Sequence, residues 1–236
     1  MKTIKNEKLI KRNGTIGNWA SIFGLLLVFI PSYFFLQALL QNSTVIPNFT
    51  VLLASTVVGI VISQIGMYLG IRYGRSPRPD EKLDTGLKGL QNEFVLYHYT
   101  TPVSHLLVGP AGVWVVKPYH QRGQVTFQKN RWRVSGGGFM QGYMRTFGQE
   151  GIGRPDIEIE SEIHSMQKYF LKHMDESQIP EINALVVFTN DLVELDAEAA
   201  PVPTMKLKQV KEFLRQKAKE KKLSAETLNQ IKTALE

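Results

Sequence analysis

The fold of this chain is decided by a run of 23 uncharged residues, NWASIFGLLLVFIPSYFFLQALL at positions 18–40, and by a second run of 23, FTVLLASTVVGIVISQIGMYLGI at positions 49–71. No charged residue occurs between positions 13 and 71. Each run is long enough to cross the hydrocarbon core of a membrane, which takes about 20 helical residues. The segment between them, at 41–48, is short, polar and contains a proline. The sequence therefore predicts two transmembrane helices joined by an external loop.

The charge of the chain is concentrated beside these two runs. The formal net charge is +7, of which residues 1–17 contribute +4 and residues 72–78 contribute +3, whereas the 20 basic and 20 acidic residues of positions 79–236 cancel. Lysine and arginine are enriched on the cytoplasmic side of transmembrane helices. We therefore expect a multi-pass protein of the inner (plasma) membrane, with both termini in the cytoplasm and the lipid bilayer as a partner. The balance beyond residue 79 argues against a domain-wide surface for nucleic acid.

The part of the chain after the second run has the pattern of an α/β domain. A helical stripe of leucines begins near Asp80, several short β-rich segments follow, and a further helix begins at Pro155 before the continuous apolar strand 182–189. Lys129-Asn130 predicts a hairpin turn, and Thr204 and Ser224 are expected to cap two C-terminal helices. The absence of cysteine excludes disulfide frameworks and thiolate zinc sites.

These patterns divide the chain into successive parts. They are a basic cytoplasmic N-terminus (1–17), transmembrane helix 1 (18–40), an external loop (41–48), transmembrane helix 2 (49–71), a basic linker (72–80), an α/β domain (81–196) and C-terminal helices (204–236).

One segment of the domain carries a family resemblance. The stretch SHLLVGPAGVWVV at 104–116, followed in register by Arg122-Gly123 and Trp132, resembles the nuclease-related domain family known as NERD. The resemblance covers roughly residues 80–190. It implies a restriction-endonuclease-like fold with an αβββαβ core, in which a carboxylate and a Glu-x-Lys pair hold a divalent metal for phosphodiester cleavage.

The same resemblance implies a degenerate catalytic site. Ser104 stands at the aspartate position, Lys117 at the glutamate position and Tyr119 at the lysine position. A cation in place of a metal ligand would repel the metal, so we expect no metal site and no cofactor. Glu93, on the first helix of the domain, is the one possible substitute carboxylate implied by the family pattern.

Two functions remain open from the sequence. The first is a membrane-anchored NERD-like module without catalytic activity that binds or scaffolds at the cytoplasmic face. The alternative is a divergent metal-dependent nuclease acting on DNA or RNA, which would use Mg²⁺ and Glu93, Glu150 or Asp156 in place of the lost carboxylates.

Further candidates are binding surfaces with ordinary structural alternatives. A polar group at a strand end could bind an anion or a nucleotide, or simply face solvent: Lys117, Tyr119, His120 and Arg122. The basic helix near 206–222 is a solvated face or a contact for anionic lipid or nucleic acid. Gly66 and Gly70 allow either a homo-oligomer or packing of the two spans against each other. His105, on an apolar strand, is expected to be a packed core residue.

Overall fold

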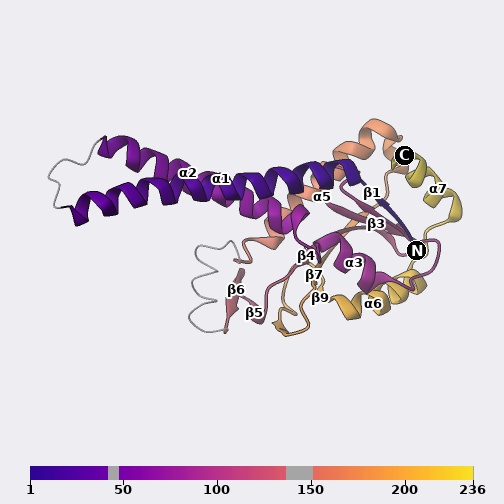
Figure 1. Cartoon of the computed structure of the whole chain (residues 1–236). Helices are drawn as coiled ribbons and strands as arrows, with labels where there is room; N and C mark the ends of the chain where they lie inside the picture. The colour runs from indigo at the N-terminus through magenta and orange to yellow at the C-terminus, as the bar shows by residue number, and fades with distance from the viewer. Residues whose placement is uncertain (42–47, 137–150, 236) are drawn as a thin grey trace. The chain divides into compact units, whose positions relative to one another are not determined.

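A computed structural model describes residues 1–41, 48–136 and 151–235 of the chain. The chain forms two compact units, one of residues Glu7–Arg78 and one of residues Met1–Asn6 together with Pro79–Glu236 (Figure 1). The first unit is a helical hairpin and the second is an α/β domain. Two long apolar helices followed by an α/β domain were predicted, and both are confirmed.

The hairpin consists of helices α1 (Glu7–Leu40) and α2 (Phe49–Leu69), and α2 continues into the π-helical turn η1 (Gly70–Gly74). Both helices are long and apolar enough to cross a membrane, and most of their large apolar side chains are exposed. Helix α1 begins eleven residues before the apolar run at position 18. Most of the loop expected at 41–48 lies outside the described residues.

Small residues bring α1 and α2 into close contact. A Cβ atom built on Gly66 would lie 2.3 Å from the backbone nitrogen of Ser21, and one built on Gly24 would lie 2.4 Å from that of Ser63. A Cβ atom on Gly70 would meet nothing within 4 Å. Gly66 thus packs the two helices of one chain together, which leaves Gly66-Gly70 unsupported as a surface for a homo-oligomer.

The N-terminus is not a single basic tail, which corrects the expectation for residues 1–17. Residues Lys2–Lys5 form strand β1, which pairs in parallel with β2 (Val95–His98). Strand β1 is therefore part of the α/β domain, although the other strands of that domain follow the hairpin in the sequence. The remaining residues, from Glu7, form the first turns of α1. Four residues with two lysines carry too short an alternation to predict a strand.

The main sheet of the domain has six strands in the order β1-β2-β3-β4-β7-β9. Its only antiparallel member is β3, so the carboxyl ends of the other five strands lie at one edge. The strands not yet bounded are β3 (His105–Gly109), β4 (Gly112–Tyr119), β7 (Ile182–Phe188) and β9 (Thr204–Lys206).

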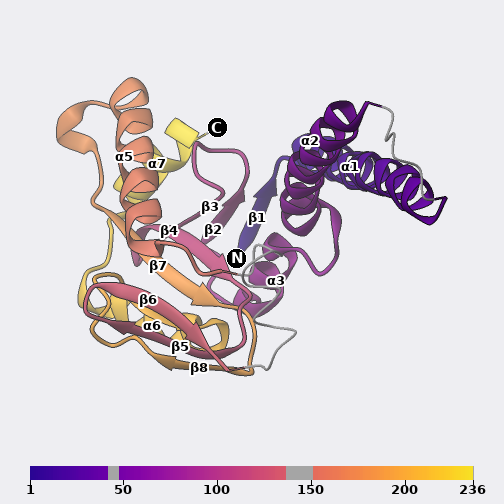
Figure 2. The same cartoon turned by 90° about the vertical axis from the view of Figure 1, so that its left-hand side faces the viewer.

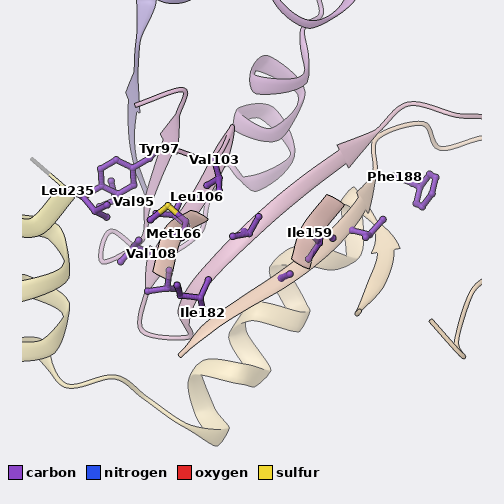
Figure 3. Close-up of a cluster of buried hydrophobic side chains, with 14 of the residues drawn as sticks. Val95, Tyr97, Val103, Leu106, Val108, Ile159, Met166, Ile182, Phe188 and Leu235 are labelled. Atoms are coloured by element: carbon purple, nitrogen blue, oxygen red, sulfur yellow. The ribbon is translucent and has the colours of Figure 1, made fainter. Parts of the chain in front are cut away.

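Helices cover both faces of this sheet. Helices α5 (Pro155–His173) and α7 (Ala225–Leu235) pack on one face, and α3 (Pro79–Leu87) and α6 (Leu207–Glu220) pack on the other. Side chains alternate along β4, so Val113 and Val115 join the first core whereas Trp114 and Val116 join the second. Figure 3 shows the first core around Ile159, with Leu106 fully buried. Both cores are needed because a mostly parallel sheet is apolar on both faces.

A second, smaller sheet has the strand order β6-β5-β8 (Figure 2). Strands β5 (Gly123–Gln128) and β6 (Arg131–Ser135) form the predicted hairpin, and β8 is Val193–Asp196. Lys129 and Asn130 both have positive φ angles, as a two-residue hairpin turn of this kind requires. A short 3₁₀ turn, η2 (Glu176–Gln178), precedes β7.

The two predicted caps have different outcomes. The backbone nitrogen of Thr227 donates to Ser224 Oγ at 3.0 Å, so Ser224 caps α7 as expected. Thr204 does not cap α6, because it starts strand β9 beside β7 and the helix begins only at Leu207. The pairing of β9 with β7 is a long-range contact that outweighs the local capping preference of threonine.

Candidate functional site

The candidate site lies at the edge of the main sheet where β4 ends. Lys117 and Tyr119 continue the alternation of Val113 and Val115, so their side chains are on the face covered by α5. Carboxyl ends of parallel strands are the usual position for ligands in open α/β sheets. The place and the face are therefore those at which a functional residue is expected.

Two glutamates of α5 converge on Lys117. Its Nζ atom lies 2.6 Å from Glu162 Oε1 and 3.1 Å from Glu158 Oε2. The hydroxyl of Tyr119 donates to Glu158 Oε2 at 3.4 Å. Glu158 and Glu162 are four residues apart on a helix, so they occupy one side of it on successive turns. The side chains of Lys117 and Glu162 are only 18% and 19% exposed, which makes their ion pair a largely buried one.

The charges of the cluster fix its protonation. Burial alone would lower the pKa of Lys117, but the charges and hydrogen bonds of Glu162 and Glu158 outweigh it and hold the pKa of the ammonium above its ordinary value. Burial raises the pKa of Tyr119, and the charges of Glu158 and Glu162 raise it further. Lys117 therefore stays charged and Tyr119 stays a neutral phenol at neutral pH.

This arrangement does not suit an anion. One ammonium faces two carboxylates, so the cluster of Lys117, Glu158 and Glu162 carries a net charge of −1. Of the four residues expected to bind an anion or nucleotide, only Lys117 and Tyr119 point toward α5. His120 and Arg122 are exposed beyond the strand end, where the backbone oxygen of His120 accepts from Asn190 Nδ2 at 3.4 Å.

The positions singled out by the family resemblance do meet at this edge, with the exception of Glu93. Strand β3 runs antiparallel to β4, so Ser104, the residue before β3, lies at the same edge of the sheet as Lys117 and Tyr119 at the end of β4. Glu93 precedes β2, whose first residue Val95 pairs with Val108 near the other end of the sheet. Val108 pairs in turn with Val113, which is four residues, or roughly 13 Å, from Lys117, and Glu93 lies two residues further away. Glu93 therefore cannot share a metal with the Lys117 cluster.

Of the other two carboxylates of the nuclease alternative, the structure describes Asp156. Asp156 is paired with its neighbour Arg154, whose Nη2 and Nε atoms lie 2.7 Å and 3.2 Å from its two oxygens. Glu150 lies outside the described residues. Among the residues that the structure describes, no three acidic or histidine side chains are placed to hold a metal ion.

A second polar cluster, which the sequence did not predict, lies on the opposite face of the sheet. His98 Nδ1 and His105 Nδ1 are 2.7 Å apart, and His98 Nε2 lies 3.1 Å from Asp84 Oδ1. Both rings are buried, so His105 is a core residue as expected. It is also part of a hydrogen-bonded chain, in which one of the two facing Nδ1 atoms must carry the proton.

Lys5 completes this cluster from strand β1. Its Nζ atom lies 2.5 Å from Asp84 Oδ2 and 3.1 Å from Asp80 Oδ2, and Asp80 is fully buried. Thr3 of the same strand donates to Asp84 Oδ1 at 3.1 Å. The spacing of Asp80 and Asp84, one helical turn apart, was the one available sequence signal, since His98 and His105 become neighbours only when β2 and β3 pair.

Comparisons of the chain with protein-family models, curated proteins and solved structures find no significant match.

Proposed function

We propose that the protein is a membrane-anchored, NERD-like module without nuclease activity, which binds or scaffolds at the cytoplasmic face of the membrane. Apart from the β5–β6 hairpin, which follows β4 and belongs to the smaller sheet, the order α3-β2-β3-β4-α5-β7 agrees with the αβββαβ core that the resemblance implies. The hairpin supplies the anchor, since both helices expose apolar surface along their length.

One observation carries the loss of catalysis: the ammonium of Lys117 lies between Glu158 and Glu162 at the edge where such a nuclease would hold its metal. A lysine in this position offsets one of the two carboxylate charges and occupies the space between them where a cation would bind. At an effective dielectric constant near 20, a divalent ion about 4 Å from the ammonium is repelled by on the order of 8 kcal/mol. The cluster is then a structural ion pair that holds α5 on the sheet.

Strand β1 supports the proposed topology. It precedes the hairpin in sequence, yet it pairs with β2 of the domain that follows the hairpin. Because hydrogen-bonded strands cannot pair across a bilayer, the N-terminus and the domain lie on the same side, as two crossings require. The lysines and arginines that flank the spans support the cytoplasm as that side.

The test uses the full chain in detergent and measures Mn²⁺ binding by electron paramagnetic resonance and cleavage of labelled DNA and RNA. We expect neither binding at millimolar Mn²⁺ nor cleavage by the wild type. Lys117→Met should gain Mn²⁺ binding, because Glu158 and Glu162 lose their counter-charge. Lys168→Met is the matched control, since Lys168 is an exposed lysine on the same helix with no ion-pair partner among the described residues.

A second variant tests the family register itself. Replacing Ser104 with Asp, Lys117 with Glu and Tyr119 with Lys together should create metal affinity, because all three positions meet at one edge of the sheet. One result would support the alternative hypothesis of a divergent nuclease. Wild-type cleavage that is sensitive to EDTA and disappears in Asp156→Ala would show that the carboxylates have moved rather than been lost.

A further inference from the structure

The positive charge of the domain is concentrated on helix α6 and the residues that flank it. Residues 79–236 are neutral overall, but positions 206–222 hold eight basic and two acidic residues, a net charge of +6. The rest of the domain therefore carries −6. A neutral domain with one strongly basic helix presents a local positive surface rather than a general attraction for polyanions.

Part of this positive charge is used within the domain. Lys217 pairs with Glu220 at 2.7 Å, Arg215 with Glu212 at 3.7 Å, and Lys221 with Glu181 at 3.4 Å. Three further lysines are exposed and have no ion-pair or hydrogen-bond partner among the described residues: Lys208, Lys219 and Lys222. Lys208 and Lys219 lie on α6 and Lys222 follows its C-terminal end, and we call the surface of these three lysines the free basic face of α6.

The other face of α6 is fully used by the core. Val210 and Leu214 are completely buried, and the ring of Phe213 packs against that of Trp114 at 5.3 Å. The helix therefore has no apolar face left to insert among acyl chains. The one aromatic ring of the helix, Phe213, is half-buried, and its remaining surface lies under the ammonium of Lys217, 5.8 Å from the ring centre, so it is not a free platform on which a nucleic-acid base could stack.

The segment after α3 extends the basic surface. Lys211 Nζ donates to the backbone oxygen of Lys88 at 3.2 Å, and this brings the exposed Lys88 of the segment after α3 beside the free basic face. Lysines spread over two elements, without a fork of arginines around one point, suit many shallow contacts to separate anionic groups better than one tightly bound phosphate.

We propose that the free basic face of α6, with Lys88, binds the headgroups of anionic lipids in the bilayer that anchors the chain. The inference rests on the membrane attachment proposed above. The tether keeps lipid headgroups at high effective concentration, so even weak contacts are occupied. Binding is electrostatic and at headgroup depth, and it therefore falls with rising salt.

The test exploits the absence of cysteine. A single Gln216→Cys substitution, on the exposed side of α6, carries a fluorophore, and the bilayer contains a headgroup-attached quencher. Gln167→Cys, on the exposed side of α5 at the opposite face of the sheet, is the control position. The full chain is reconstituted in phosphatidylcholine vesicles with or without phosphatidylglycerol.

We expect quenching at Gln216 to be several-fold stronger with phosphatidylglycerol and to be lost at high salt, with no change at Gln167. Reversing the three free lysines to glutamate should abolish the difference. Reversing three other exposed basic residues without ion-pair partners among the described residues should not: Arg131, Lys168 and Lys172.

Three results separate the possible failures. Equal quenching at Gln216 in both vesicles would overturn the lipid contact, although the chain still floats with the vesicles. Protection of the Gln216 label by an RNA or DNA oligonucleotide, but not by phosphatidylglycerol, would identify nucleic acid as the partner instead. Failure of the chain to float with either vesicle would instead refute the membrane anchor itself.

Discussion

Replacing Lys5 with methionine tests how strand β1 is held to the domain. The side chain of Lys5 is 19% exposed, and its ammonium faces Asp84 and the fully buried Asp80. Methionine keeps the unbranched apolar stem but removes the charge, which leaves two carboxylates beside each other without their lysine. Removing one partner of a buried ion pair usually costs about 3 to 5 kcal/mol.

The structure favours the lower end of that range. Asp84 keeps its hydrogen bonds from Thr3 and with His98, each at 3.1 Å, so part of its stabilisation survives the loss of Lys5. We therefore expect a loss of about 3 kcal/mol in the free energy of unfolding of the domain. For a domain of this size the midpoint of thermal unfolding then falls by roughly 6 to 12 °C.

Tryptophan fluorescence of the full chain measures this change, because Trp114 and Trp132 are buried in the domain. Lys2→Met is the matched control: Lys2 lies in the same strand, but it is exposed and has no ion-pair partner among the described residues, so its loss should cost less than about 0.5 kcal/mol. Adding Asp84→Asn to Lys5→Met should recover part of the stability by removing the excess negative charge. Equal shifts for Lys5→Met and Lys2→Met, or no recovery in the double variant, would refute the charge-based reading.

Three shorter predictions concern acid stability, the hairpin and topology. Burial alone would raise the pKa of Asp84, but its bonds to His98 and Lys5 hold the pKa below its ordinary value of 3.8. Ionised Asp84 therefore stabilises the domain above pH 3.8, and this contribution is lost as the pH falls through the lower pKa of the folded state. Asp84→Asn should accordingly reduce the loss of stability at acid pH in a stability–pH profile. Gly66→Ala should weaken packing of α1 on α2 by about 1 to 3 kcal/mol, as judged by disulfide crosslinking of paired cysteines, whereas Gly70→Ala should not. Reporters fused after residue 236 and within 41–48 should read as cytoplasmic and external, respectively, and a C-terminal reporter outside the cell would contradict the proposed topology.

The sequence alone determined those features that depend on neighbouring residues. The two apolar runs predicted α1 and α2, the alternation around Lys129-Asn130 predicted the β5–β6 hairpin, and Ser224 predicted the start of α7. Each follows from a pattern a few residues long, because helix periodicity, strand alternation and capping are local properties of the backbone.

Only the tertiary structure decided what the polar residues do. Lys117 was expected at a site edge, but its partner Glu162 is 45 positions away, and Lys5 reaches Asp80 across 75 positions that include the whole hairpin. Strand β1 likewise has too few residues to be predicted from the sequence, and it is defined only by its pairing with β2. Such contacts depend on the order of strands in the sheet and on which face each helix covers, and neither can be predicted from the residues next to a lysine in the sequence. For the same reason the two long apolar helices can be predicted from the sequence, whereas the charge balance of the candidate site is decided only when α5 packs on β4.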